Sequence, residues 1–165
     1  MKFESLGAEE KKMIKHVEKN NIFVLETKSF HYVLGIDGAG FNRYIHWGEK
    51  CDVNDYEFEA VHGISSNDPA LNGIKQEITP FGSTMYRECD IKARFEDGCR
   101  EIFLVYKGFE QNGDTLKLRF EDEYYPLGVT LCYEVFEEYD IIKRYVTLTN
   151  TGSNDIVFER IFSAE

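Results

Sequence analysis

Strict alternation of apolar and polar side chains dominates the second half of the chain. Residues 116–120 and 127–135 carry an apolar side chain at every second position. A period of two is typical of a β-strand that is buried on one face only. Residues 142–148 follow the same rule, except that Arg144 shares the face of three aliphatic side chains. The pattern therefore predicts three strands over these ranges.

The rest of the chain adds shorter runs of β-branched, aliphatic and aromatic residues, which predict further strands. These runs lie at residues 22–25, 30–34, 41–47 and 156–161. The last run changes phase before Ile161. Segments rich in Gly, Asn, Asp and Ser, which favour tight turns, separate the runs. Such strands at regular spacing predict an all-β, antiparallel β-sandwich.

The first twenty residues have a different pattern. Met13, Ile14 and Val17 follow helical spacing. Acidic residues come first and four lysines follow, an order that suits the dipole of a helix. We therefore predict a helical extension over residues 1–20 and a β-sandwich domain over residues 21–165.

The stretch from Cys51 to Thr79 has no sustained alternation and is rich in Asp, Asn, Ser and Gly. A loop of this length within a compact domain is usually functional or disordered. We expect it to be the one place where the sandwich presents something besides strands.

Composition excludes several classes of protein. Of the 165 residues, 42% are apolar and 15% are aromatic, which is enough to build a core and rules out intrinsic disorder. The formal net charge of −11 disfavours binding to nucleic acid and to anionic membrane surfaces, because both need clustered cations. The sequence contains no run of about 18 apolar residues, so we expect no transmembrane helix. The N-terminus also lacks the apolar core of a secretory signal.

The cysteines and histidines predict no metal site. Cys51, Cys89, Cys99 and Cys132 contain no C-x-x-C pair and are too few for a disulfide scaffold. We therefore expect reduced thiols and a cytoplasmic protein. The four histidines stand fifteen or sixteen residues apart, without the spacing of metal ligands. We predict neither a metal nor another cofactor.

Local motifs for catalysis or phosphate binding are weak. The segment Gly35 to Gly40 has the order G-x-x-G-x-G and no helix follows it, so a hairpin turn explains it better than a phosphate loop. No G-x-S-x-G nucleophile elbow is present. The thirty acidic residues guarantee chance pairs of carboxylates. From the residues alone, a glycosidase-type carboxylate pair therefore stays undecided.

Aromatic residues of the C-terminal part have two explanations. They are Tyr124, Tyr125, Tyr133, Phe136, Tyr139 and Tyr145. They can form a platform that stacks against a sugar, or they can fill the sandwich core. Because aromatic side chains are favoured in strands, we favour the core.

Several segments, in order, resemble the N-terminal region of bacterial α-galactosidases of glycoside hydrolase family 36. Residues 45–50 (Ile-His-Trp-Gly-Glu-Lys) are similar to a Leu-Tyr-Trp-Gly-Lys-Lys strand end of that family, and residues 79–88 resemble the region of its P-x-x-G-x-x-D-F-R motif. Further similar segments lie at residues 25–33, 95–98, 104–108, 125–131, 137–144 and 149–152. The likeness covers about residues 22–164.

The resemblance implies a fold and a division of labour. The fold is a galactose-mutarotase-like β-supersandwich, of which this chain matches the first half. In the family a (β/α)8 barrel follows and carries both catalytic aspartates, so no catalytic residue is expected here. The implied role is oligomer assembly and completion of the substrate site of an enzyme that acts on α-galactosides such as melibiose and raffinose. The implied partners are the catalytic barrel, further copies of the chain and an α-galactoside.

The resemblance also implies candidate contacts to the sugar. In tetrameric family members, the loop after the Tyr-Trp-Gly strand reaches a neighbour's active site, and the corresponding loop here is residues 52–76. We carry over Trp47, Asp68 and Arg87 as candidate substrate-binding residues. The alternatives are a tryptophan at a sandwich edge, an Asx turn and a surface arginine. Met85 departs from the family motif, which usually has Asp there.

Two other functions remain open. One is a stand-alone carbohydrate-binding module, which needs a concave aromatic face. The other is a structural module for protein interactions. Half a sandwich leaves unpaired strand edges and an exposed apolar face. We therefore expect self-association, with residues 156–162 as a candidate surface.

Overall fold

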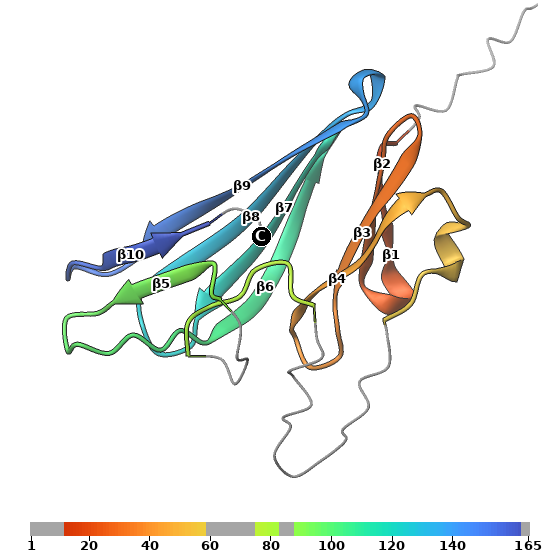
Figure 1. Ribbon diagram of the computed structural model, residues 1–165. Helices are drawn as coiled ribbons and strands as arrows, with labels where there is room; N and C mark the ends of the chain where they lie inside the picture. Colours follow the sequence, from red (N-terminus) through yellow and green to blue (C-terminus); the bar gives the residue numbers. More distant parts are fainter. Residues whose placement is uncertain (1–11, 59–74, 83–87, 163–165) are drawn as a thin grey trace, which may run out of the picture.

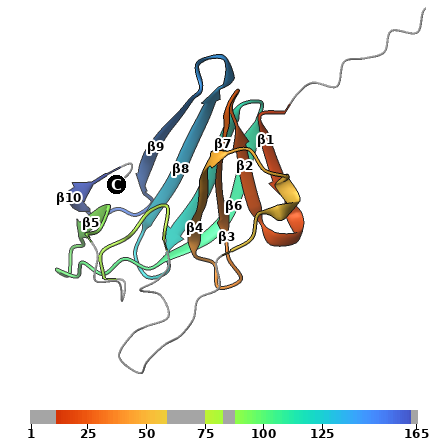
Figure 2. The same ribbon diagram turned by 45° about the vertical axis from the view of Figure 1, so that its right-hand side comes forward.

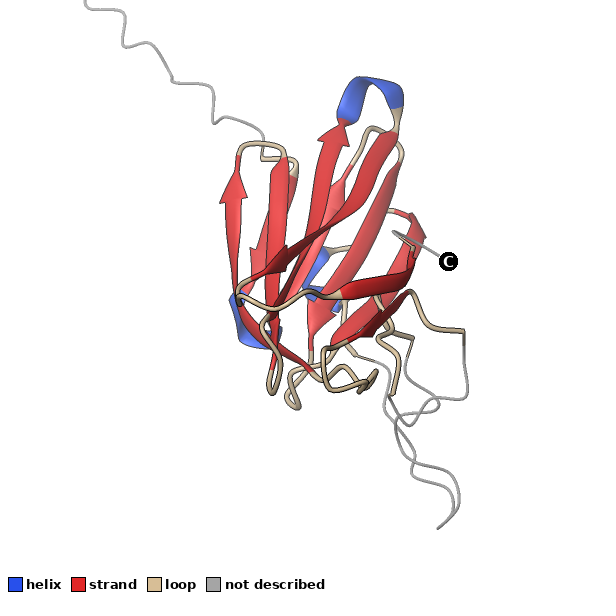
Figure 3. Cartoon of the chain, turned by 90° about the vertical axis from the view of Figure 1, so that its left-hand side faces the viewer, coloured by secondary structure: helices blue, strands red, loops and turns tan. Residues whose placement is uncertain are grey.

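Strands make up most of the structure, a computed structural model that describes residues 12–58, 75–82 and 88–162. The strands are β1 (Ile14–Val17), β2 (Ile22–Glu26), β3 (Phe30–Ile36), β4 (Asn42–Glu49), β5 (Ile91–Arg94), β6 (Leu104–Asn112), β7 (Thr115–Asp122), β8 (Leu127–Phe136), β9 (Ile141–Asn150) and β10 (Val157–Ile161). The helical segments of these ranges are short 3-10 helices, drawn blue in Figure 3. They are η1 (Glu18–Asn20), η2 (Val53–Asp55) and η3 (Glu137–Tyr139). None of the helices in the described ranges has the length and apolar character needed to cross a bilayer.

Two antiparallel four-stranded sheets form the body of the fold. The first has the order β1-β2-β3-β4 and the second the order β6-β7-β8-β9, so each is a chain of hairpins between consecutive strands. Figure 1 shows the first sheet in red to orange and the second in green to blue. The pair β10-β5 forms a small third sheet, which lies beside β8 and β9 in Figures 1 and 2. The predicted all-β, antiparallel, sandwich-like fold is confirmed.

The core lies between the two large sheets. Alternate residues of β7 and β8 are buried, including Leu118 and Leu131, which are cross-strand partners. From the first sheet, Phe23, Leu25 and Leu34 join the same apolar cluster. The alternation noted in the sequence thus corresponds to one buried face on each strand, and burial of that face is the main force that holds the sheets together.

The helix predicted over residues 1–20 is wrong where the structure describes it. Residues 14–17 form β1, which pairs with β2 through Ile14 opposite Leu25. Ile14 is buried in the main core, and Lys15 on the other face binds Glu26 at 2.9 Å. A short segment follows tertiary pairing rather than its own helical spacing, because so short a helix is only marginally stable. Residues 1–11 lie outside the described residues.

The turn between β3 and β4 has the geometry that its sequence predicts. Residues 35–40 connect β3 to β4, and Gly40 has a φ of 86°, which favours glycine. This confirms the hairpin interpretation of the glycine-rich segment.

The phase change near the end of the chain corresponds to a register shift between Phe158 and Arg160 in the pairing of β10 with β5. All four cysteines lie in the described part of the chain and are free thiols.

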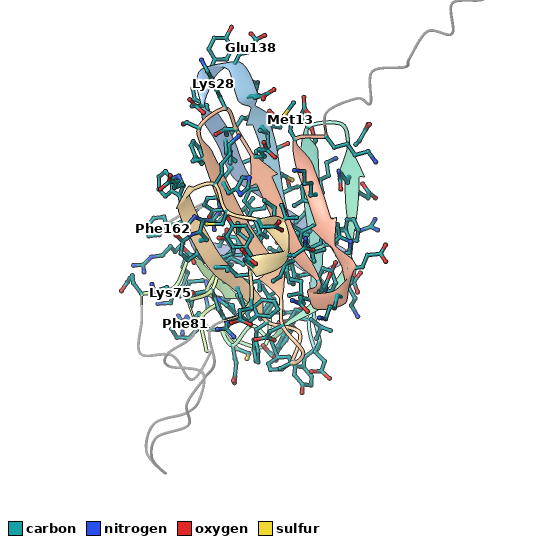
Figure 4. The ribbon with its side chains drawn as sticks, turned by 90° about the vertical axis from the view of Figure 1, so that its right-hand side faces the viewer. Met13, Lys28, Lys75, Phe81, Glu138 and Phe162 are labelled. Carbon is teal, nitrogen blue, oxygen red and sulfur yellow. The ribbon has the colours of Figure 1, made fainter. Side chains whose placement is uncertain are left out.

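A hydrogen bond links the β2–β3 turn to the residue before β9 at one end of the molecule. The backbone N–H of Ser29, in the β2–β3 turn, donates to Oδ1 of Asp140 at 2.8 Å. Asp140 follows η3 and has a φ of 52°. Lys28 and Glu138, next to these two residues, lie at the same end of the molecule in Figure 4. The contact fixes how far the first sheet stands from β9.

We predict that Leu118→Ala lowers the free energy of unfolding by about 2–5 kcal/mol, because it leaves a cavity between the sheets. Lys117→Ala, one residue away on the exposed face, is the matched control and should change stability by less than about 0.5 kcal/mol. Urea denaturation followed by far-UV circular dichroism measures both. Equal losses in the two variants would contradict the assignment of faces.

Candidate functional site

An open groove of about 660 Å³ lies between the first sheet and β9. Strands β3 and β4 supply one wall, and the start of β9 supplies the other. The lining residues are Phe30, Tyr32, Tyr44, Trp47, Lys75, Gln76, Glu77, Asp90, Asp140, Ile141, Ile142 and Arg144. A groove of this volume with apolar walls and a few convergent polar groups has the properties of a ligand or partner site.

Aromatic side chains form the wall on the first sheet. Trp47 is 66% exposed, although it lies in the middle of the pairing between β3 and β4 opposite Tyr32. Its ring lies 6.2 Å from Phe30 and 6.3 Å from Tyr32, both in inclined arrangements. Tyr32 in turn contacts Tyr44 edge to face at 5.9 Å. The first sheet thus presents an exposed aromatic surface beside the groove.

A buried carboxylate, Glu77, forms the floor. Tyr32 donates to its Oε1 and Tyr133 to its Oε2, each at 2.6 Å. Nη1 of Arg144 lies 3.2 Å from Oε2 of Glu77, and Nη2 of Arg144 donates to the backbone carbonyl of Glu77. The Glu77 side chain is 1% exposed and that of Arg144 is 16% exposed. The buried charge is therefore paired and hydrogen-bonded, as burial requires.

Electrostatics hold these groups in one protonation state. Burial raises the pKa of both Tyr32 and Tyr133, and the charge of Glu77 raises it further. Burial alone would lower the pKa of Arg144, but the neighbouring Tyr133 and Glu77 outweigh it and raise it. Both phenols therefore stay neutral donors and the guanidinium stays charged at any physiological pH.

The lining carboxylates are committed to structural hydrogen bonds. Glu77 accepts from two tyrosines, Asp140 accepts from Ser29, and Oδ2 of Asp90 accepts from the backbone of Thr79 at 2.7 Å. These hydrogen bonds give the three carboxylates a structural role in the groove.

The predicted site residues have different outcomes. Trp47 lines the groove as an exposed edge aromatic. Asp68 and Arg87 lie outside the described residues, so their predicted contacts with a sugar stay predictions. The buried group of Glu77, Tyr32, Tyr133 and Arg144 was missed. The one signal for it was Arg144 on an otherwise aliphatic face, which calls for a buried partner.

The aromatic residues divide between the two explanations. Tyr133 is fully buried, as the core interpretation predicts. Tyr124 and Tyr139 are 76% and 71% exposed, so the core interpretation is wrong for them. Neither of the two lines the groove.

In the described ranges, no three His, Cys, Asp or Glu side chains gather as metal ligands would.

Comparison with known proteins decides the family. Residues 40–165 match the model of the glycosyl hydrolase family 36 N-terminal domain. The chain belongs to this family. The matched range begins in the β3–β4 turn and includes every later strand, so the groove walls on β4 and β9 lie within the family 36 N-terminal domain.

The similar proteins are α-galactosidases. The bifunctional α-galactosidase/sucrose kinase AgaSK of Mediterraneibacter gnavus is 29% identical, over 87% of this chain and 18% of its own length. The α-galactosidase AgaA of Geobacillus stearothermophilus is 25% identical, over 84% of this chain and 24% of its own length. The chain therefore spans about a fifth to a quarter of the length of these relatives.

Solved structures agree on the fold. The galactosidase domain of AgaSK superposes with a TM-score of 0.79 at 27% identity, over 92% of this chain and 25% of that one. The α-galactosidase AgaB of Geobacillus stearothermophilus gives the same TM-score at 21% identity, over 91% and 24% of the two chains. At that lower identity the likeness shows the fold alone.

We predict that Tyr133→Phe costs about 1.5–3 kcal/mol of stability, since it removes a hydrogen bond to a buried charge and leaves an oxygen of Glu77 with one donor fewer. Tyr139→Phe, at an exposed tyrosine, is the control and should be neutral within about 0.5 kcal/mol. Thermal and urea unfolding of both variants measure the difference. A neutral Tyr133→Phe would mean that the phenol does not stabilise the carboxylate.

Proposed function

We propose that the chain is the non-catalytic N-terminal domain of an α-galactosidase, and that it serves oligomer assembly and completes the substrate site. The observation that carries the proposal is the family match over residues 40–165, together with relatives that are several times longer and are named α-galactosidases. The partner in this proposal is the catalytic barrel. The carboxylates of the groove support a binding role, because they are committed to structural hydrogen bonds.

The proposed substrate class is an α-galactoside such as melibiose or raffinose. AgaA of Geobacillus stearothermophilus, which shares this fold with a TM-score of 0.72, has been solved in complex with raffinose. Exposed aromatic rings stack against the apolar faces of ligands, and Trp47 offers such a ring beside the groove. The proposal places Trp47 against the outer sugar of a substrate or against a neighbouring subunit.

Assembly is supported by exposed apolar side chains at strand edges. Val157, Ile161 and Phe162 in and after β10 are each 45–48% exposed. Exposed apolar side chains of this kind contribute to interaction surfaces. We include a homo-oligomer in the proposal, and light scattering on the purified chain tests it. A strict monomer at high concentration would count against assembly. The four free thiols support a reducing compartment, which keeps the cytoplasm in the proposal.

A second candidate is a stand-alone carbohydrate-binding module, which the aromatic groove favours. Calorimetry with raffinose separates the two. A stand-alone module gives heat that Trp47→Ala abolishes, whereas Tyr124→Ala, at an exposed aromatic that does not line the groove, leaves it unchanged. No heat at millimolar sugar removes this candidate.

We predict that the chain alone does not hydrolyse an aryl α-galactoside, because its groove offers no free acid and nucleophile in the described residues. A chimera tests the positive half of the proposal. In the chimera, this chain takes the place of the matching segment of the galactosidase domain of AgaSK. Trp47→Ala in the chimera should raise KM for raffinose several-fold more than KM for the aryl substrate, which lacks the outer sugars.

The control for the chimera is Tyr124→Ala, which should leave both KM values unchanged. Turnover by the chain alone would refute the non-catalytic role. An equal effect of Trp47→Ala on the two substrates would refute the contact with the outer sugar and leave only assembly. If the chimera does not fold, the assay of the chain alone and light scattering still decide the first two claims.

A further inference from the structure

A second apolar cluster lies on the outer face of the first sheet, away from the main core. Its fully buried members are Ile22, Val24 and Val33, and Tyr56 is 7% exposed. Val53 and Phe58 pack against the same cluster. The residues that follow β4, from Cys51 to Phe58, therefore do not leave the sheet as a free loop. They turn back and cover its outer face.

The close approach of Phe58 shows how tight this cover is. A Cβ added at Gly35 would stand 2.9 Å from Cζ of Phe58 and 2.9 Å from the carbonyl oxygen of Asn21. The guanidinium of Arg43 lies 5.6 Å from the centre of the Phe58 ring, a cation–π distance. The sequence thus keeps a side chain off the sheet where the covering segment needs the space.

A buried histidine holds the segment at its middle. Nδ1 of His31 lies 2.9 Å from Oη of Tyr56, and both residues are buried. The same Oη accepts the backbone N–H of Cys51 at 3.3 Å. Since that oxygen already accepts one hydrogen, its own hydrogen is available to Nδ1. When Oη donates this hydrogen to Nδ1, His31 is neutral and carries its proton on Nε2.

Charged groups surround the other side of the ring. Nε2 of His31 lies 3.7 Å from Oε2 of Glu26. Glu26 also binds Lys15 from β1 at 2.9 Å and Lys50 after β4 at 3.0 Å. His46 from β4 stacks obliquely near Tyr56, with ring centres 5.3 Å apart.

Burial favours the neutral imidazole, and the surrounding charges act on it in both directions. Burial by itself would raise the pKa of Glu26, but hydrogen bonds from Lys15 and Lys50 outweigh it and lower that pKa to about 2. Glu26 therefore stays ionised at physiological pH. Burial lowers the pKa of His31 below its ordinary 6.5; Glu26 opposes this, and the two lysines add to it.

We propose that His31 and Tyr56 form a proton-sensitive clamp that fixes residues 51–58 on the outer face of the first sheet. Protonation of Nδ1 turns the acceptor of the Tyr56 hydrogen into a donor. The phenol then loses Nδ1 as the acceptor of its hydrogen in a buried place, which is costly. The clamp does not depend on a substrate, so it stands or falls separately from the proposed α-galactosidase role.

The sign of the pH effect follows from the direction of the shift. The clamped state favours neutral His31, so its stabilisation is complete above the ordinary pKa of 6.5. It is lost as pH falls below 6.5 toward the lower pKa of the clamped state. Asp52, which accepts from Asn54, has a pKa lowered mainly by hydrogen bonds from Asn54 and does not titrate in this range.

Two variants should shift the His31 titration in opposite directions. Tyr56→Phe removes the donor to the neutral form and should raise the pKa of His31. Glu26→Gln removes the nearby negative charge and should lower it. Nuclear magnetic resonance of the imidazole protons measures both, with His46→Gln to assign the signals and Tyr139→Phe as the control that leaves them unchanged. Shifts of the same sign in the two variants, or none, would overturn the clamp.

Hydrogen exchange tests the consequence for the segment. The amides of Cys51, Asn54 and Asp55 have defined acceptors within residues 51–58. Their opening constant, corrected for intrinsic exchange, should rise as pH falls below 6.5, by at most tenfold per pH unit for one proton. Amides of β8 should not change.

Variants make this test decisive. In His31→Gln the pH dependence of the opening constant should vanish, because glutamine does not titrate. Tyr56→Phe should reduce it, because the hydrogen bond is gone while burial still lowers the pKa of His31, and it keeps the aromatic ring in the cluster. Opening that is flat between pH 8 and pH 5 in the unaltered chain would refute the proposal. So would a slope that persists undiminished in both variants.

Discussion

The buried carboxylate of Glu77 joins the two halves of the sandwich. Glu77 accepts hydrogen bonds from Tyr32 of the first sheet and from Tyr133 of the second, and it pairs with Arg144 on β9. Apolar burial holds sheets together without direction. Hydrogen bonds to a buried charge have strict geometry, and breaking a buried pair leaves an uncompensated charge. Together with the contact between Ser29 and Asp140, the hydrogen bonds of Glu77 therefore hold the two sheets apart across the groove.

The first sheet is covered on both faces, and each face has its own polar centre. The inner face packs on the second sheet, and its polar centre is Glu77. The outer face is covered by residues 51–58, and its polar centre is His31 with Tyr56. Antiparallel sheets often leave one face to solvent. Here the double cover explains why β2 is a continuous run of buried residues from Ile22 to Leu25 rather than an alternating one.

The sequence predicted the strands whose burial has a local signature. One-sided burial of β7 and β8 repeats every second residue, and the register shift of β10 is visible as a change of phase. The prediction failed at β1, because Ile14 and Val17 fit helical spacing while only pairing with β2, eight residues further on, makes them a strand. Residues 51–58 were expected to be irregular, and Tyr56 gave no local sign of burial.

The two polar centres, Glu77 and the pair of His31 and Tyr56, could not be predicted either, because their members come together only in the folded chain. Glu77 lies in a stretch without periodicity, and its partners come from β3, β8 and β9. Such a constellation depends on where the chain folds in space and leaves no spacing in the sequence. Arg144 was the exception, since a charge on a buried face requires a partner whatever its place in the chain. Trp47 was singled out through a resemblance, and the structure adds that its ring is exposed beside the groove.

The position of the groove explains how the proposed binding role and a stable fold coexist. Strands β4 and β9 are the last strands of their sheets among the described residues, and both border the groove. An edge strand offers unpaired backbone groups, and an exposed aromatic beside it offers apolar area. Both are costly when left to water and favourable when covered. One backbone group of β4 is already paired, since the N–H of Tyr44 donates to the carbonyl of Lys75. Because the charge of Glu77 is paired and hydrogen-bonded, the proposed partner or sugar would gain apolar contact at this edge without disturbing the pair of Glu77 and Arg144.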